Sequence, residues 1–328
     1  MKVLIRTDAS VEIGSGHVMR CLTVAEALRE RGCRVVFMMK ALPGDLIEYV
    51  RSIGFEVISD FQPADLCIID HYTIDERWER SIRPFVDKIV VIDDLANRRH
   101  DCDMLLDQNI VPDFKIRYNA LVPGHCVKLL GPANLIMRNE FVSARQQMSK
   151  RRAHVQRLLL FMGGTDPTNE TMKVLSALQK TTTKFAYVDV IVGSGNPKRV
   201  EIEKICNKEK FHFHCQIDYM ASLMAQADFA IGAGGSATWE RCYVGLPSSS
   251  TIVAANQVVS TETAASLGAV WNMGWHEKVT VETYLQLLSD LPNHQKELRE
   301  MSENGIKLTE SPDGPNPWIE KIMELMEK

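Results

Sequence analysis

The chain has 328 residues, of which 45% are hydrophobic and 24% are charged, and its formal net charge is -4. These values are typical of an ordinary globular protein that is long enough for about two domains with separate cores. The small negative charge, without a stripe of basic and aromatic residues, argues against nucleic acid as a partner.

Cysteine usage and apolar runs give an expected location. The 8 cysteines are scattered singly, without a Cys-x-x-Cys pair, and most have apolar neighbours. They are therefore expected to be reduced core residues of a cytoplasmic protein. The chain begins with an apolar strand instead of a charged leader, so no signal peptide is expected. No apolar run approaches the roughly 18 residues that span a bilayer, which argues against a membrane segment.

The first glycine-rich segment, residues 14–21, has the sequence GSGHVMRC. It follows an apolar strand at residues 3–5 and begins a helix that Gly32 ends. His17 is therefore expected in the first helical turn, where free N–H groups and the helix dipole favour an anion. A histidine that titrates near neutrality would place a base beside that anion. Glycine turns occur in many α/β proteins, and the third glycine of a dinucleotide fingerprint is absent, so the turn alone does not decide between a functional and a structural histidine.

The first half of the chain then alternates strands and helices. Apolar runs are typical of buried parallel strands, and they occur at residues 34–38, 55–58, 66–69 and 88–92. This βαβ series predicts a parallel sheet. Ligands bind such sheets at the carboxyl ends of the strands, where the following polar residues are expected to gather: Asp8, His17, Asp70, Tyr72 and Asp94. Each aspartate is equally explained as a turn former or a helix cap.

The triplet Asp101-Cys102-Asp103 has the spelling of a DxD metal motif. No cluster of histidine or carboxylate partners lies near it at metal-ligand spacing. We interpret the triplet as the polar start of a strand at residues 104–106. Neither a metal nor a cofactor is predicted.

A charged segment at residues 138–154 separates the two halves, and the linker is expected near residue 150. A strand at 157–162 then opens into the second glycine-rich turn, which begins with Gly163, Gly164 and Thr165. This arrangement repeats that of the first half. Two similar domains, 1–150 and 151–328, are therefore expected.

The third glycine-rich turn, residues 232–240, follows a strand at 229–231. Gly234 and Gly235 allow a close backbone approach, and Ser236 adds a hydroxyl at a helix start, which together are typical of a phosphate cradle. Glu240, one turn later, is placed to accept hydrogen bonds from a ribose diol. The alternative is that Ser236 caps the helix and Glu240 supports the cap. Further along, Asn256 and Gln257 offer two carboxamides for sugar hydroxyl or acetamido groups.

Taken together, segments 6–10, 14–21, 69–72, 162–166 and 256–257 resemble the UDP-2,4-diacetamido-2,4,6-trideoxy-β-L-altropyranose hydrolases of pseudaminic acid biosynthesis. That family is similar to the MurG-type glycosyltransferases. The likeness covers nearly the whole chain, and its short motifs are specific in combination. It implies an α/β protein with the GT-B fold, in which two Rossmann-like domains with parallel sheets face each other across a cleft. The second domain would bind UDP, and the final helix would pack back on the first.

The resemblance also implies roles for individual residues. His17 matches the catalytic histidine, Ile217 would lie beside the uracil, and Glu240 would bind the ribose. The remaining substrate-binding positions implied by the motifs are Asp8, Gly14, Gly16, Arg20, Asp70, Tyr72, Gly163, Gly164, Thr165, Gly234, Gly235, Ser236, Asn256 and Gln257.

The implied reaction is metal-independent hydrolysis of a UDP-linked diacetamido-trideoxy sugar with inversion, which yields UDP and free sugar. A monomer with no membrane partner is expected. One alternative is a glycosyltransferase in which His17 activates an acceptor hydroxyl instead of water. Spore-coat polysaccharide proteins share these motifs, and a nucleotide-sugar binding protein without turnover is a further alternative.

Overall fold

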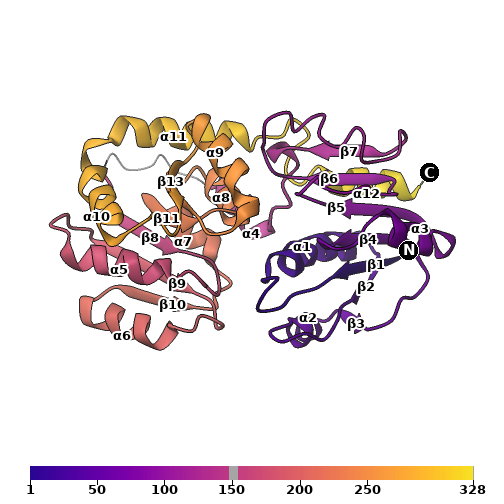
Figure 1. Ribbon diagram of the computed structural model, residues 1–328, viewed down its shortest axis with the longest axis horizontal. Helices are drawn as coiled ribbons and strands as arrows, with labels where there is room; N and C mark the ends of the chain where they lie inside the picture. The colour runs from indigo at the N-terminus through magenta and orange to yellow at the C-terminus, as the bar shows by residue number, and fades with distance from the viewer. Residues whose placement is uncertain (148–153, 328) are drawn as a thin grey trace. The chain divides into compact units, whose positions relative to one another are not determined.

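The computed structural model describes residues 1–147 and 154–327. The chain forms two compact units: Met1–Met137 with Ser311–Lys328, and Arg138–Glu310 (Figure 1). The linker expected near residue 150 lies outside the described residues, and the division comes earlier because helix α4 (Asn139–Gln146) packs against α7 (Met220–Gln226) in the second unit. Within the described part of the chain, no helix combines the length and apolar character needed to cross a membrane.

The first unit contains a seven-stranded parallel sheet in the order β3-β2-β1-β4-β5-β6-β7. Its strands are β1 (Lys2–Thr7), β2 (Arg34–Met38), β3 (Glu56–Ile58), β4 (Ala64–Asp70), β5 (Val86–Ile92), β6 (Met104–Asp107) and β7 (Val127–Leu130). Its first helices are α1 (Gly16–Glu30), α2 (Ile47–Ser52) and α3 (Glu76–Ile82). The predicted parallel sheet is confirmed, whereas the short, half-exposed β7 was not expected from its sequence.

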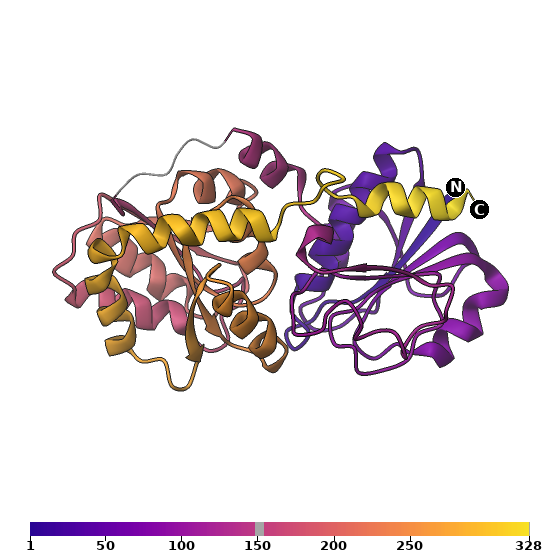
Figure 2. The same cartoon turned by 90° about the horizontal axis from the view of Figure 1, so that it is seen from above.

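The central strands of this sheet are buried on both faces, because successive side chains enter different cores. Val3 and Ile5 belong to one hydrophobic cluster and Leu4 to another. Helix α12 (Trp318–Met326) completes the first cluster with Trp318, whose indole N–H donates to the Leu135 carbonyl at 3.0 Å. Figure 2 shows this last helix, in yellow, on the first unit, where it contacts α1 and β5, so the end of the chain is part of the first unit's core.

The second unit contains a six-stranded parallel sheet in the order β10-β9-β8-β11-β12-β13. Its strands are β8 (Arg157–Phe161), β9 (Tyr187–Val192), β10 (His212–Cys215), β11 (Phe229–Ala233), β12 (Ser248–Ile252) and β13 (Trp271–Trp275). Its other helices are α5 (Glu170–Lys180), α6 (Arg199–Glu209), α8 (Ser236–Tyr243), α9 (Val258–Ser266), α10 (Val281–Asp290) and α11 (Gln295–Leu308).

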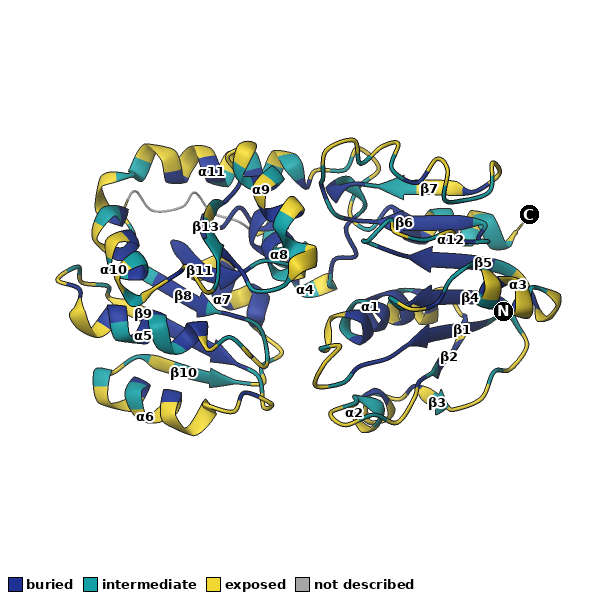
Figure 3. Cartoon of the chain, in the orientation of Figure 1, coloured by how far each residue is buried: buried dark blue, intermediate teal, exposed yellow. Residues whose placement is uncertain are grey.

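Burial explains which parts of these units are available to a ligand. The central strands are buried, while exposed residues lie on loops and on outer helix faces (Figure 3). In the first unit the loops after β1, β4 and β5 leave the same edge of the sheet, as do those after β8, β11 and β12 in the second. Each of the three glycine-rich turns therefore lies at the carboxyl edge of its own sheet, where α/β proteins bind ligands.

Candidate active site

The first glycine turn holds His17 in a restricted position. Gly14 has a φ of +81°, a conformation that residues with a side chain rarely adopt, and its N–H donates to the Ser10 carbonyl at 2.8 Å. Gly16 begins α1, and His17 follows as the second residue of the helix with only 6% of its surface exposed. The turn therefore fixes where the imidazole enters the unit.

Asp70, the last residue of β4, binds that imidazole. His17 Nδ1 lies 2.5 Å from Asp70 Oδ1, and the Asp70 side chain is fully buried. Arg20 takes both carboxylate oxygens, with Nε 2.5 Å from Oδ2 and Nη2 2.6 Å from Oδ1. Both oxygens thus have protein partners, and the contact of Asp70 with the histidine is one that the sequence did not indicate. The expected substrate contact of Asp70 stays a prediction.

The charge on Asp70 follows from its neighbours. Burial raises the pKa of the Asp70 carboxyl, but the charge of Arg20 and the hydrogen bonds from Arg20 and His17 outweigh it and leave that pKa well below its usual value. The carboxylate is therefore ionised at neutral pH. Because an ionised carboxylate only accepts, Nδ1 of His17 must donate, and Nε2 of the neutral ring carries the lone pair.

Arg20 joins two strand ends. Besides Asp70, its Nη1 donates to Asp94 Oδ2 at 3.2 Å, and Asp94 follows β5. Its guanidinium is therefore paired with two carboxylates, and the expected contact of Arg20 with substrate stays a prediction. The predicted gathering of Asp70 and Asp94 at one sheet edge is confirmed, with Arg20 as the group that joins them.

Tyr72 packs against the histidine. The two rings are 4.3 Å apart between centroids and meet edge-on at 83°. Tyr72 lies two residues beyond β4, so the strand that supplies Asp70 also supplies this aromatic wall. His17 is thus held by the Asp70 carboxylate at Nδ1 and by the edge-on packing of the Tyr72 ring.

Asp8 belongs to a different network. Arg6 donates to both of its oxygens at 2.6 Å, and the Lys40 N–H donates at 2.8 Å. His71 Nε2 lies 3.1 Å from Oδ2. Burial raises the pKa of Asp8, but these hydrogen bonds and the Arg6 charge outweigh it and lower that pKa below its usual range. The structure therefore holds Asp8 in the turn after β1 and not against His17.

In the second unit, the turn after β8 packs against another glycine. Gly163 has a φ of +94°, and Gly193 N donates to the Gly164 carbonyl at 2.9 Å. A Cβ atom on Gly193 would lie 2.6 Å from that oxygen, so the close approach requires glycine. Thr165 lies beside Gly195 across the same contact. Gly193 was not among the site residues expected from the sequence.

The side chain of Gln257 lies beside the third glycine-rich turn. Gly235, with a φ of +91°, precedes α8, and Ser236 is the first residue of that helix. A Cβ atom on Gly234 would lie 2.9 Å from Gln257 Oε1, and that oxygen also accepts from Val253 N at 3.0 Å. The structure thus places Gln257 beside the glycine turn. Gln257 is the last residue of the 3₁₀ helix η3 (Ala255–Gln257), which also contains Asn256. Gly235 occupies the cap position, so the alternative reading of Ser236 as the cap is wrong.

Glu240 has a cationic partner that the sequence analysis missed. Arg138 Nη2 donates to Glu240 Oε1 at 2.9 Å, and Arg138 Nη1 lies 2.6 Å from Glu140 Oε1. The partners are separated by 102 positions, so no local pattern indicates the pair. Ile217, the remaining expected residue, is half-buried in the loop that follows β10, at the same sheet edge as the two glycine turns.

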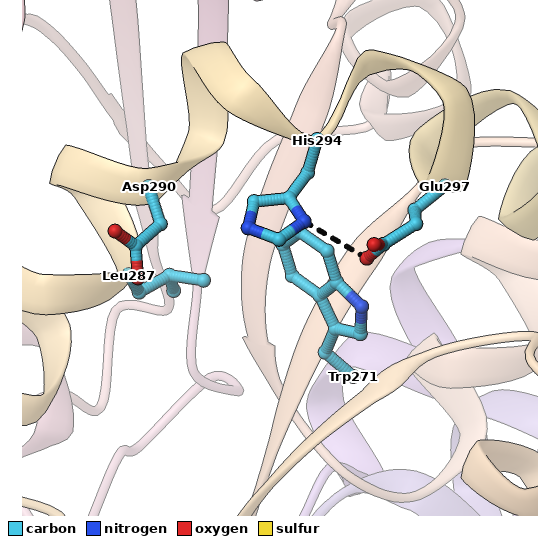
Figure 4. A pocket seen from close by; sticks show the side chains of 5 residues that line it. All are labelled: Trp271, Leu287, Asp290, His294 and Glu297. Atoms are coloured by element: carbon cyan, nitrogen blue, oxygen red, sulfur yellow. Dashed lines mark hydrogen bonds and ion pairs between the residues drawn. The ribbon is translucent and has the colours of Figure 1, made fainter.

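A surface hollow elsewhere in the second unit is lined by Trp271, Leu287, Asp290, His294 and Glu297 (Figure 4). His294 Nδ1 lies 2.9 Å from Glu297 Oε2, and its ring meets Trp271 at 5.4 Å between centroids. Trp271 is the first residue of β13, so the hollow is at the amino edge of the sheet. It is therefore separate from the glycine turns, which lie at the carboxyl edge.

Residues 158–312 match the Glycosyltransferase family 28 C-terminal domain. Three similar proteins match most of the chain. The UDP-2,4-diacetamido-2,4,6-trideoxy-beta-L-altropyranose hydrolase of Campylobacter jejuni is 29% identical over 72% of this chain and 86% of its own. The spore coat polysaccharide biosynthesis protein SpsG of Bacillus subtilis is 28% identical over 88% of each chain. The uncharacterized protein MJ1062 of Methanocaldococcus jannaschii is 28% identical over 75% of this chain, which spans about half (54%) of that protein.

Solved structures share the architecture. MurG of Acinetobacter baumannii superposes with a TM-score of 0.63 at 13% identity, covering 99% of both chains. Arabidopsis thaliana UGT89C1 superposes with a TM-score of 0.65 at 11% identity, also over 99% of both. At such identities the likeness concerns the fold alone. The predicted α/β class with the GT-B fold is confirmed.

Proposed function

We propose that the chain is a UDP-sugar-processing enzyme related to the altropyranose hydrolase and SpsG, and that it hydrolyses a UDP-linked 2,4-diacetamido-2,4,6-trideoxy sugar. The products are UDP and the free sugar, an intermediate for nonulosonic acid synthesis. The first unit supplies the base, and the second binds the nucleotide.

The observation that carries the proposal is the contact between His17 and Asp70 at 2.5 Å. With Nδ1 donating to an ionised carboxylate, Nε2 of His17 accepts a proton from water as the water oxygen bonds to the anomeric carbon. The bond from that carbon to the UDP oxygen breaks, and its electron pair leaves with the diphosphate. Attack opposite the leaving group inverts the anomeric configuration. Asp70 stabilises the imidazolium that forms.

The second unit suits the leaving group. Gly235 opens the turn before α8 and Ser236 begins the helix, so N–H groups and the helix dipole favour the negative charge that develops on UDP. Gln257 adds a carboxamide at Gly234, and Glu240 is assigned to the ribose diol. The other glycine turn, with Gly163, Gly164 and Thr165, and the neighbouring Asn256 and Ile217 complete the proposed contacts.

The surroundings of His17 favour water over a larger acceptor. Only 6% of the residue is exposed, and Tyr72 covers it edge-on. Water reaches a confined base more readily than a bulky sugar hydroxyl does. The family 28 match and the MurG likeness favour a second candidate, transfer of the sugar to an acceptor by the same base.

The test is to incubate the purified protein with the UDP-linked diacetamido-trideoxy sugar and EDTA, without an acceptor, and to follow UDP and the free sugar by NMR. Release of both, with inverted configuration, supports the hydrolase. Replacing His17 with Gln is expected to slow it by roughly a hundred- to ten-thousand-fold while UDP affinity is kept. UDP binding without turnover in the unaltered protein would instead favour the transferase.

A further inference from the structure

Arg241 lies buried beneath the third glycine turn. It is on α8 with none of its surface exposed. Its Nε donates to Ser248 Oγ at 3.1 Å, and its Nη2 donates to Ser250 Oγ at 2.9 Å and to the Ala233 carbonyl at 3.0 Å. A further bond joins Nη2 to Thr238 Oγ1 at 3.1 Å. All four acceptors are uncharged.

The charge of Arg241 is therefore not balanced by an ion pair. Over the described ranges, no carboxylate oxygen lies within 4.0 Å of its guanidinium, and buried Nη1 has no hydrogen-bond partner. Its neighbour Glu240 is paired with Arg138 instead. Burial lowers the pKa of Arg241 to about 10, so the side chain remains a cation at neutral pH. A buried charge without a partner costs free energy, which a bound anion would recover.

The position of the guanidinium is tied to the glycine turn. A Cβ atom on Gly232 would lie 2.5 Å from Arg241 Nη1, so the cation fits only because this strand position lacks a side chain. The Ala233 carbonyl that accepts from Nη2 directly precedes Gly234, and Thr238 belongs to the first turns of α8. The cation thus contacts the segments on both sides of the turn.

We propose that Arg241 is the buried countercharge of the nucleotide diphosphate, a positioning residue that holds the glycine turn and adds positive charge beneath it. The inference rests on the proposed binding of UDP by this turn. The α8 N-terminus supplies only partial charge, whereas a diphosphate carries at least two full negative charges. In a poorly solvated site a full cation strengthens the attraction for the leaving group.

A purely structural role would rest on the same hydrogen bonds, which join β11, α8 and β12. The two roles differ in their dependence on ligand charge. A structural defect weakens uridine and UDP binding alike, whereas loss of a countercharge weakens UDP most, UMP less and uridine little.

Calorimetric titration with UDP, UMP and uridine separates these roles. We expect Arg241→Met to raise the Kd for UDP by roughly 10- to 100-fold and that for uridine by less than about threefold, and Arg241→Lys to recover part of the UDP affinity. Arg145→Met is the matched control, because Arg145 also donates to uncharged groups but contacts the Tyr243 carbonyl at the far end of α8. It should leave the ratio of UDP to uridine affinity unchanged.

Circular dichroism establishes whether Arg241→Met folds. If it does not, Gly232→Ala displaces the guanidinium without removing its charge and should lower the UDP to uridine affinity ratio in the same direction. Equal losses for UDP and uridine, or no loss for either, would overturn the inference while the proposed function stands. Absence of UDP binding by the unaltered protein would overturn both.

Discussion

Nδ1 of His17 and Oδ1 of Asp70 meet at 2.5 Å across 53 positions of sequence, one from the helix after β1 and the other from the last residue of β4. Adjacent parallel strands bring the two together, since β1 pairs with β4. The dyad therefore depends on the sheet and not on a flexible loop, as a base that must keep one orientation requires.

Replacing Asp70 with Asn is expected to reduce kcat by about 10²- to 10⁴-fold, because the imidazolium loses its countercharge and Nδ1 loses an obligate acceptor. UDP affinity should change little, since the nucleotide is assigned to the second unit. Steady-state hydrolysis and calorimetric UDP titration measure the two effects. Asp103→Asn is the control, since this carboxylate pairs with Arg83 at 2.5 Å in the same unit and has no contact with His17. Full activity of Asp70→Asn would remove the basis for the dyad.

If Glu240 binds the ribose, the affinity gained from the ribose hydroxyls should depend on the Glu240 side chain. Unaltered protein should bind UDP about tenfold more tightly than its 2′,3′-dideoxy analogue, and this difference should shrink in Glu240→Gln, because a carboxamide oxygen accepts more weakly than a carboxylate oxygen and only one of its two polar atoms accepts. Glu140→Gln is the control, since Glu140 shares Arg138 with Glu240. If both variants keep the difference, the ribose contact is wrong.

Asp107 predicts a pH dependence of stability in the first unit. Burial raises the pKa of its carboxyl to about 7, with Asp94 and Asp93 adding to the rise against the lowering effects of the Asn109 N–H and Arg117. The folded state thus binds a proton that the unfolded state has released. The associated stability is complete below about pH 4 and is lost as the pH rises to about 7, by up to about 4 kcal/mol.

Asp107→Asn should remove this dependence, because the amide does not titrate. Urea unfolding at pH 5 and pH 8 checks the expectation: the unaltered protein should lose stability between these values, and the variant should lose less. A variant with the same loss between pH 5 and pH 8 would assign the effect to another group.

The sheets and glycine turns could be predicted because apolar runs report buried parallel strands and glycine reports positive φ. The sequence also placed Asp70 and Asp94 at one edge. The sequence did not show that Asp70 pairs with His17 and Arg20, because strand order determines which residues are near one another but not the direction of a side chain. The pairing of Arg138 with Glu240 likewise depends on contacts between distant segments.

Two other features could not be predicted from the sequence, for physical reasons. The charged stretch that suggested a linker contains α4, whose Phe141 is buried, so a few apolar positions outweigh the polar composition. Arg241 lies on the buried side of α8, where helical periodicity leads one to expect an apolar residue. Only the neighbouring hydroxyls of β12 and the glycine of β11 make room for a cation there.

The return of α12 to the first unit has a consequence for biosynthesis. Trp318 is fully buried in a core built mostly from the first 137 residues. During synthesis on the ribosome, that core lacks Trp318 until the whole second unit has emerged. Residues 138–310 can therefore fold as a continuous insert while the first unit is still open, and the final helix closes it from the other end of the chain.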